Sequence, residues 1–461
     1  MVTLWHNQQS AKDLILKGQS AYIAHEMGCG KTLTVVDSAR ELEVCLILCP
    51  VAVGATWERE FARHDPDRRV IVAVSGPVAK RAEKVSEALA EGGRLAIVLN
   101  YEAVAPATSK PLRTALEKAR RIDAIVLDEA HRIKSPRGKA SKWVAKLAND
   151  KHPQAKRICL SGTPTPQSPF DWWSQFRFLD PSILGTNYPG FQRRIATLHP
   201  QLNFVLGWNA EGLSALTERI DPYIHRVKSS DVLDLPEELH ETIPVTLSRP
   251  ARRFYNELEK EMVALLDNGE TVTAANKLVA VNRLMMATSG YARSEENDQV
   301  LQPIAEGLPD KAKALSDWLE DFPRDEPLAI IAVRHVDLDA IAQVLRDHGR
   351  SYGELSGRRK ELASWQNGGT DALIVQMQAG NAGIDLTRSC YLIYYSISHS
   401  NGDYLQSLAR IRRPGQTRCC RYYHLTCTDT IDESIYAALE KKQDIVDAVC
   451  EKLTRRMEGV L

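Results

Sequence analysis

Residues 122–131, with the sequence IDAIVLDEAH, decide the fold. The first six are largely apolar and predict a buried strand, and the acidic pair Asp128-Glu129 follows where that strand ends. Ligands of open α/β sheets gather beyond the carboxyl ends of parallel strands, so an acidic pair at this point indicates a binding site. Upstream lies EMGCGKT, residues 26–32, in which Gly28 and Gly30 allow the backbone to approach a triphosphate closely. Together the two stretches predict one nucleotide-binding domain.

The residue types in these stretches match the chemistry of phosphoryl transfer. Lys31 would reach the β and γ phosphates of ATP, and the Thr32 hydroxyl would bind Mg²⁺. Asp128 would hold the same Mg²⁺, while Glu129 orients and deprotonates the attacking water. His25 stands where the usual phosphate-loop pattern begins with glycine. Either stretch alone also fits a packing turn or a helix N-cap, but the two in this order favour nucleotide binding.

Six segments together give the chain a specific resemblance. They resemble the motor of the Swi/Snf-type DNA translocases within the superfamily-two helicases, here in a compact, single-motor form. In the first lobe they are EMGCGKT (26–32), LCP (48–50), DEAHRIK (128–134) and LSGTP (160–164); in the second, AGNAGIDL (379–386) and QSLARIRRPGQ (406–416). The resemblance extends from about Leu4 to about Glu433. It implies a DNA-dependent ATPase, an ATP-dependent translocase or remodeller of double-stranded DNA that hydrolyses ATP with Mg²⁺ in a cleft between two lobes.

Composition limits the class of protein. A chain of 461 residues is too long for one ordinary core. Lys+Arg and Asp+Glu both number 59, so any nucleic-acid binding must come from a locally basic surface. The nine cysteines form no Cys-x-x-Cys pair, and no apolar run approaches the roughly 18 residues of a membrane span. We expect a reduced intracellular compartment, bacterial or viral-host cytoplasm or nucleus, no structural zinc and no membrane.

Short apolar runs that alternate with helical patterns predict an α/β fold with buried parallel strands. With the resemblance, this becomes two tandem RecA-like parallel-sheet lobes, a helical insertion between them and a C-terminal helix. We expect the first lobe at 1–180, the helical protrusion at 181–309, the second lobe at 310–430 and the closing helix at 431–461. The expected strands are 44–49, 95–99, 124–127 and 157–160, then 329–333, 373–376, 391–395 and 420–424, and the protrusion has helices at 252–268 and 273–286.

The resemblance also assigns residues that complete the nucleotide site. Gln8 takes the position that recognises the adenine edge, and Gln9 is the rival position. Arg410 and Arg413, three apart on a predicted helix, are the expected arginine fingers, with Gln406 one turn earlier. An ordinary basic helix surface is the alternative. Gly383 and Asp385 would line the other side of the cleft, and the family commonly has asparagine where Asp385 stands.

DNA contacts follow from the same motifs. Pro50 and Tyr101 lie in the tracking-strand motifs of the first lobe, and Arg132 and Lys134 follow the Asp-Glu-Ala-His turn; Arg334 is the candidate of motif four. Phosphate contact is the expected chemistry, because a translocase must hold any sequence. Ser161-Gly162-Thr163 would couple nucleotide state to DNA binding, and His399 stands where the family usually has tryptophan.

Two further functions compete with translocation along double-stranded DNA. One is a strand-separating or branch-migrating DNA helicase, since the motor motifs do not distinguish tracking from unwinding. The other is a nucleotide-gated DNA clamp subunit of a larger complex. In each case the expected partners are double-stranded DNA and a protein that recruits the motor, and the chain itself is expected to be a monomer.

Overall fold

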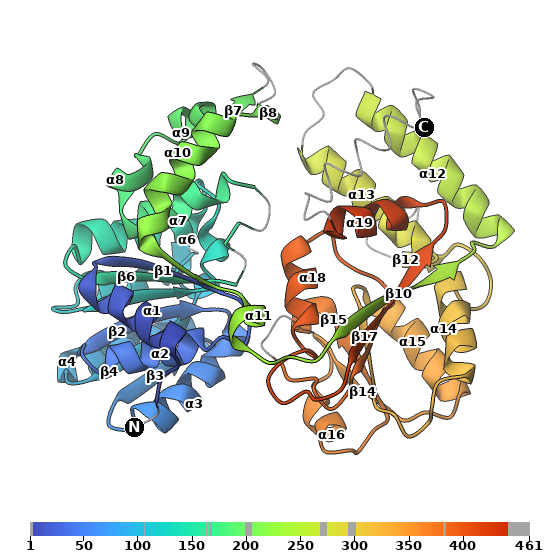
Figure 1. Ribbon diagram of the computed structural model, residues 1–461, viewed down its shortest axis with the longest axis horizontal. Helices are drawn as coiled ribbons and strands as arrows, with labels where there is room; N and C mark the ends of the chain where they lie inside the picture. The colour runs from blue at the N-terminus through green and yellow to red at the C-terminus, as the bar shows by residue number, and fades with distance from the viewer. Residues whose placement is uncertain are drawn as a thin grey trace. The chain divides into compact units, whose positions relative to one another are not determined.

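The computed structural model describes residues 3–105, 107–162, 164–165, 168–198, 205–267, 274–293, 301–380 and 384–440. The chain divides into two compact units, Met1–Asp234 and Leu235–Leu461. Each unit is built on a parallel β-sheet with helices packed against it (Figure 1). The expected α/β class with two parallel-sheet lobes is confirmed.

The sheet of the first unit has the strand order β3-β4-β2-β5-β6-β1-β9, and neighbouring strands pair in parallel. Four strands match the expected positions: β2 (Val44–Cys49), β4 (Leu95–Asn100), β5 (Ala124–Asp128) and β6 (Lys156–Leu160). Three were not expected: β1 (Ser20–His25), β3 (Arg69–Ala73) and β9 (Ile224–Val227). β3 and β9 lie at the edges of the sheet, where exposed and buried residues mix, so their hydropathy signal is weak.

The sheet separates two hydrophobic clusters, one on each of its faces. Along β2, Leu46 and Leu48 belong to one cluster, whereas Ile47 belongs to the other, as the alternation of strand side chains requires. The helices are α1 (His6–Lys17), α2 (Lys31–Ala39), α3 (Gly54–His64), α4 (Val78–Glu91), α5 (Lys110–Glu117), α6 (Lys139–Lys146), α7 (Asp171–Leu179), α8 (Pro181–Leu184), α9 (Tyr188–Ile195), α10 (Ala210–Ile220) and α11 (Ser229–Val232). A hairpin of β7 (Ala196–Leu198) and β8 (Val205–Trp208) follows α9.

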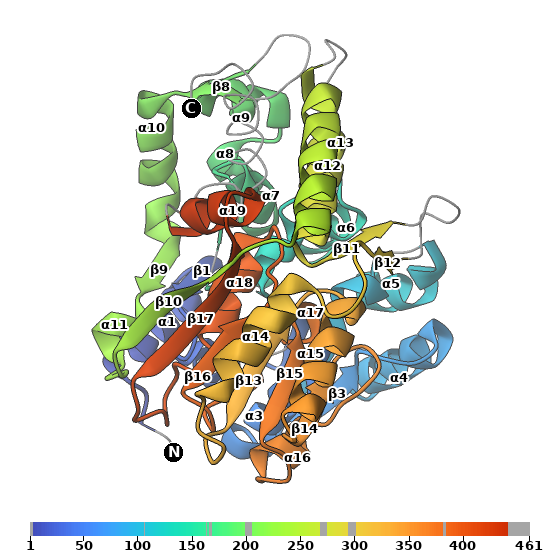
Figure 2. The same cartoon turned by 90° about the vertical axis from the view of Figure 1, so that its right-hand side faces the viewer.

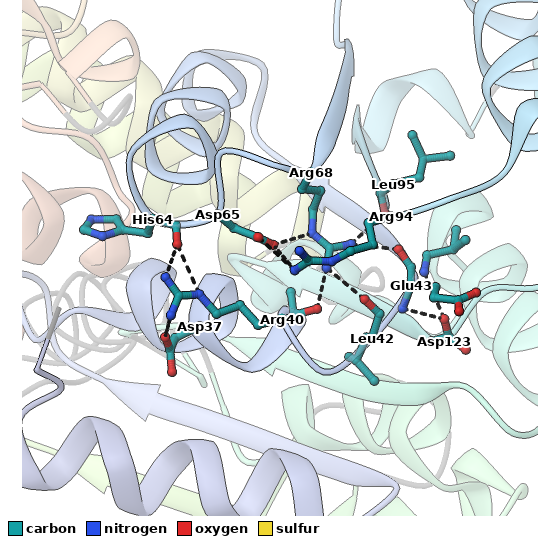
Figure 3. A network of polar contacts seen from close by, with 12 residues as sticks. Asp37, Arg40, Leu42, Glu43, His64, Asp65, Arg68, Arg94, Leu95 and Asp123 are labelled. Carbon is teal, nitrogen blue, oxygen red and sulfur yellow. Dashed lines mark hydrogen bonds and ion pairs between the residues drawn. The ribbon is translucent and has the colours of Figure 1, made fainter. Parts of the chain in front are cut away.

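A buried guanidinium binds the backbone at the amino ends of β2 and β4 (Figure 3). Arg68 donates to Asp65 at 2.7 Å and to the carbonyl oxygens of Glu43 at 2.7 Å and Leu95 at 3.2 Å. Its side chain is fully buried, so these bonds satisfy a charge that would otherwise be costly to desolvate. The network lies at the entry to β2 and β4 and leaves their carboxyl ends available for function.

The sheet of the second unit has the order β10-β17-β16-β13-β15-β14, again with parallel pairs. Figure 2 shows α14 and α15 alongside it. The strands are β10 (Glu238–Val245), β13 (Leu328–Ala332), β14 (Tyr352–Leu355), β15 (Ala372–Gln376), β16 (Tyr391–Tyr394) and β17 (Cys420–Cys427), and β11 (Tyr291–Arg293) and β12 (Leu301–Pro303) form a hairpin. The helices are α12 (Arg249–Asp267), α13 (Ala274–Thr288), α14 (Asp310–Glu320), α15 (His335–Asp347), α16 (Leu362–Gln366), α17 (Met377–Gly380), α18 (Asn401–Leu408) and α19 (Ile431–Glu440).

The segment 181–309, expected as a helical protrusion, contains β-strands as well as helices. It carries the expected helices α12 and α13, but it also contributes β9 to the first sheet and β10 to the second. β10 is largely exposed along one edge and rich in polar residues, so its sequence lacks the apolar run of a central strand. The closing helix is described as far as Glu440, and 441–461 lie outside the described residues. Among the helices of the described ranges, none has both the length and the apolar character needed to cross a bilayer.

A buried ion pair joins the helices of the second unit. Lys311 Nζ on α14 lies 2.7 Å from Asp432 Oδ2 on α19, and both side chains are below 10% exposed. Asp432 also accepts a hydrogen bond from the Thr288 hydroxyl at 2.9 Å and one from the Cys427 amide at 3.1 Å. Burial acts to lower the pKa of Lys311, but the attraction of Asp432 outweighs it and raises that pKa. Four elements, α13, α14, β17 and α19, therefore meet at one carboxylate.

We predict that Asp432→Asn lowers the free energy of unfolding by about 3–5 kcal/mol, because the Lys311 ammonium would stay buried without its counterion. Lys313, two residues further along α14, provides the control. It pairs with Asp310 at 3.0 Å but is 54% exposed, so Lys313→Ala should cost no more than about 1 kcal/mol. Urea unfolding of both variants measures the difference. Equal losses would contradict the role assigned to the buried pair.

Candidate nucleotide site and basic groove

The phosphate loop connects the end of β1 to the start of α2. Gly28 and Gly30 adopt φ values of 81° and 76°, in the left-handed region that glycine enters without steric cost. The amide of Cys29 donates to the Glu26 carbonyl at 3.4 Å and closes the turn. Since α2 begins at Lys31, the loop directs backbone N–H groups and the positive end of a helix dipole to one point. This backbone fits a polyphosphate.

Lys31 bends back over this loop. Its Nζ donates to the carbonyl oxygens of His25 at 2.8 Å and Glu26 at 3.2 Å. Thr32 follows in the first turn of α2 and is half-buried. Gly162, just beyond β6, packs against the same place, because a Cβ built on it would lie 3.7 Å from Lys31 Nζ. Thr163 lies outside the described residues.

The structure distinguishes Gln8 from its rival. Gln8 is 2% exposed, and its Oε1 accepts a hydrogen bond from the Trp5 amide at 2.9 Å. Its Nε2 lies so close to Gly30 that a Cβ added there would come within 1.9 Å. Gln9 is exposed and donates to Asp13 at 3.0 Å. The structure therefore brings Gln8, and not Gln9, to the phosphate loop.

Asp128 occupies the last position of β5 and is 6% exposed. The indole N–H of Trp57 donates to its Oδ2 at 2.9 Å, and the Tyr101 hydroxyl donates to its carbonyl oxygen at 2.8 Å. Burial and the neighbouring Glu129 carboxylate raise the pKa of Asp128 to about 6, while the bond from Trp57 acts in the opposite direction. A buried carboxylate in this setting favours a bound cation. Trp57 was missed by sequence reasoning, because nothing local links α3 to β5.

Glu129 has a left-handed backbone, with φ 53° and ψ 55°. A non-glycine residue in this region is strained and is often part of a functional site. Its Oε2 lies 3.3 Å from His131 Nδ1 and 3.5 Å from the Ser161 hydroxyl oxygen, and the latter two groups are 3.2 Å apart. Ser161 follows β6, so this cluster links the ends of β5 and β6.

The residues expected to contact DNA in the first unit differ in how exposed their side chains are. Tyr101 is 4% exposed, its hydroxyl donates to the Asp128 carbonyl, and its contact with DNA stays a prediction. Arg132 is exposed and donates to Glu102 at 3.0 Å. Pro50 and Lys134 are half-buried. Arg132 and Lys134 follow the acidic pair in the chain, and their contacts with DNA stay a prediction.

The expected helix through Arg410 and Arg413 is wrong, because α18 ends at Leu408 and both arginines lie in the turns that follow. Pro414 disfavours helical backbone at the residue before it and so accounts for Arg413, but not for the end of α18 at Leu408. The two residues still meet at one segment: the Arg410 carbonyl accepts from the Leu386 amide at 3.0 Å, and Arg413 Nη1 donates to the Ile384 carbonyl at 3.1 Å.

The other candidates of the second unit belong to the same region. The Asp385 carboxylate accepts hydrogen bonds from the Thr387 amide at 2.9 Å and the Thr387 hydroxyl at 2.6 Å. Gln406 lies on α18 and is 8% exposed. Gly383 lies outside the described residues. The structure therefore brings Asp385 into the segment that contacts Arg410 and Arg413.

A groove of about 280 Å³ in the second unit is lined by apolar side chains together with several basic and amide side chains. We call it the basic groove. Its polar lining comes from α13, β11, the N-cap of α15, α17 and the loop before α18: Asn282, Arg283, Arg293, Arg334, Gln378, Ser398 and His399. Arg334 and His399 were singled out from their motif positions. Arg283 and Arg293 were missed, because they come from segments distant in sequence that only the fold brings together.

A glycine-rich loop with a lysine, an acidic pair and a serine on neighbouring parallel strands defines a phosphate-loop nucleotide-binding protein. Residues 1–298 match the SNF2-related domain, which is more than half of the chain. The chain belongs to the SNF2-related family.

Named relatives agree with this assignment. The protein YwqA of Bacillus subtilis, whose name describes an ATP-dependent helicase/translocase, is 25% identical over 94% of this chain and 47% of its own length. The "Uncharacterized ATP-dependent helicase MG018" of Mycoplasma genitalium is 23% identical over 92% and 40%, so the chain spans less than half of either relative. The Sulfolobus solfataricus SWI2/SNF2 ATPase core in complex with dsDNA is 21% identical, covers 99% of this chain and 95% of its own, and superposes with a TM-score of 0.44.

We predict that Gln8→Ala weakens binding of an ATP analogue about tenfold, the effect expected when one or two hydrogen bonds to the base are lost. Gln9→Ala is the matched control, since the Gln9 side-chain amide donates to Asp13 on the helix surface. Equilibrium binding to the two variants makes the comparison. Equal affinities of Gln8→Ala and Gln9→Ala for the analogue would contradict a role of Gln8 in recognising the base.

Proposed function

We propose that this chain is an ATP-dependent double-stranded DNA translocase or remodeller, a DNA-dependent ATPase. One observation carries the proposal. The phosphate loop and Ser161 follow β1 and β6, and the Asp128-Glu129 pair lies at the end of β5. These three strands are adjacent in a single parallel sheet. Phosphoryl transfer depends mainly on positioning and charge stabilisation, and this edge of the sheet supports both.

Different residues of the nucleotide site would bind the phosphates, hold the metal ion and accept the proton. Loop amides and Lys31 would bind the β and γ phosphates, and Thr32 and Asp128 would hold Mg²⁺. The ion would neutralise charge on the phosphate oxygens. Glu129 would accept the proton of the attacking water, and its strained backbone and its contacts with His131 and Ser161 fix the carboxylate in place.

The basic groove supports DNA as the partner. Its arginines can neutralise phosphates, which are identical in every sequence, as a translocase requires. The first unit's proposed contacts on the same grounds are Pro50, Tyr101, Arg132 and Lys134. A monomer recruited to its site of action by a protein partner completes the proposal.

A strand-separating or branch-migrating helicase is the first alternative, and a displacement assay with a labelled strand distinguishes it from a translocase. A nucleotide-gated clamp subunit is the second. Steady-state turnover stimulated by DNA in the isolated chain would exclude a pure clamp.

We predict that duplex DNA accelerates ATP hydrolysis much more than single-stranded DNA or RNA, and that the effect weakens steeply with salt. Glu129→Gln should bind ATP and Mg²⁺ but stall hydrolysis, whereas Lys31→Ala should lose productive binding. Parallel ATPase assays with each nucleic acid decide the assignment. Equal stimulation by RNA and duplex DNA would contradict it, and normal turnover in Glu129→Gln would remove Glu129 as the base.

Arg410 and Arg413 are proposed to stabilise the transition state. Arg410→Ala and Arg413→Ala should each reduce DNA-stimulated kcat on the order of 10³-fold, as for other arginine fingers. ATP affinity should change much less, because the first unit supplies the loop, Gln8 and the acidic pair. Arg418 serves as the control: it is half-exposed and pairs with Glu326 at 2.8 Å, so Arg418→Ala should keep near-normal turnover. Unchanged kcat in both Arg410→Ala and Arg413→Ala would contradict a role of these arginines in transition-state stabilisation.

A further inference from the structure

The first residues of the phosphate loop are hydrogen-bonded to the segment with which the first unit ends. The Glu26 amide donates to the Val227 carbonyl at 2.9 Å, which extends the pairing of β1 with β9. The Glu26 carboxylate then accepts two hydrogen bonds from Ser229, one from its amide at 2.9 Å and one from its hydroxyl at 2.7 Å. Ser229 begins α11, and the first unit ends shortly afterwards at Asp234.

A second contact holds the residue before Glu26. His25 Nε2 lies 2.8 Å from His225 Nδ1, across the β1–β9 pair. His25 is fully buried, so its ring has little freedom to turn away from His225. Both residues at the start of the loop, His25 and Glu26, are thus attached to the strand and turn at 225–229.

The other side of these two residues faces the nucleotide-binding lysine. Lys31 Nζ binds the carbonyl oxygens of His25 and Glu26, so the backbone that His225 and Ser229 hold is the same backbone that holds Lys31. A shift at 225–229 would therefore move the loop and its lysine together.

We propose that Ser229 and His225 are positioning residues of the nucleotide site, and that through them nucleotide binding is coupled to the segment connecting the two units. The inference rests on the proposed ATP-binding function of the loop. Coupling of this kind is reciprocal: a nucleotide that orders the loop also orders 225–229, and a displacement of the connecting segment changes nucleotide affinity.

The expected effect falls on affinity more than on catalysis. The loop contacts the phosphates both before and during the reaction, and loss of such uniform binding raises KM while kcat stays nearly constant. A purely structural role of Ser229 would instead lower stability without changing affinity for the folded protein.

Ser229→Ala is the test variant, and Ser230→Ala is its matched control. Ser230 is the next residue of α11, but its hydroxyl bonds to Asp231 at 3.0 Å and not to the loop. A fluorescent ATP analogue, titrated without DNA, should bind Ser229→Ala about three- to tenfold more weakly, the factor expected for one lost hydrogen bond. Ser230→Ala should bind as the unchanged protein does, and Ser229→Thr, which keeps the hydroxyl, should restore affinity.

A second measurement separates positioning from folding. Amide hydrogen exchange across 26–31 should be faster in Ser229→Ala than in Ser230→Ala, while the urea midpoints of the two variants stay equal. Equal affinities and equal exchange in the two variants would overturn the inference, as would a loss of kcat at unchanged affinity. Because the titration contains no DNA, it stands even if DNA fails to stimulate the unchanged protein, an outcome that would defeat only the translocase proposal.

Discussion

The site depends on the parallel pairing of β5, β6 and β1. Asp128 lies opposite Leu160, and Leu160 lies opposite Ile23, so the three strands end at nearly the same level. Each chain segment that follows a strand then begins at the same edge, although these segments are distant in sequence. A shift of one residue in either pair would reverse the faces of a whole strand, and the buried clusters on both sides of the sheet oppose such a shift.

Much of this arrangement was predictable because strong local signals coincide with motifs. β2, β4, β5 and β6 are apolar and central, so hydropathy finds them. Edge strands such as β9 and β10 are partly solvated and give little signal. The predicted helix through Arg410 and Arg413 failed in part for a reason that the sequence already contained, because Pro414 disfavours helical backbone at Arg413.

Other features required the fold itself. Trp57 reaches Asp128 from α3, Ser229 reaches Glu26 from the end of the unit, and Arg283 and Arg293 join Arg334 in the basic groove. Each contact connects residues far apart in the chain, and a single sequence contains no signal for such pairs. The bond from the Tyr101 hydroxyl to the Asp128 carbonyl is another such contact, which the motif around Tyr101 does not reveal.

The left-handed backbone of Glu129 limits which substitutions can raise the stability of this protein. Glycine would relax that conformation and is the substitution that stabilisation by backbone design would select, yet it would delete the carboxylate. Stability and the proposed activity would therefore compete at this single residue. Thermostable variants are better sought away from β5, at surface positions where conformational preference and chemistry do not conflict.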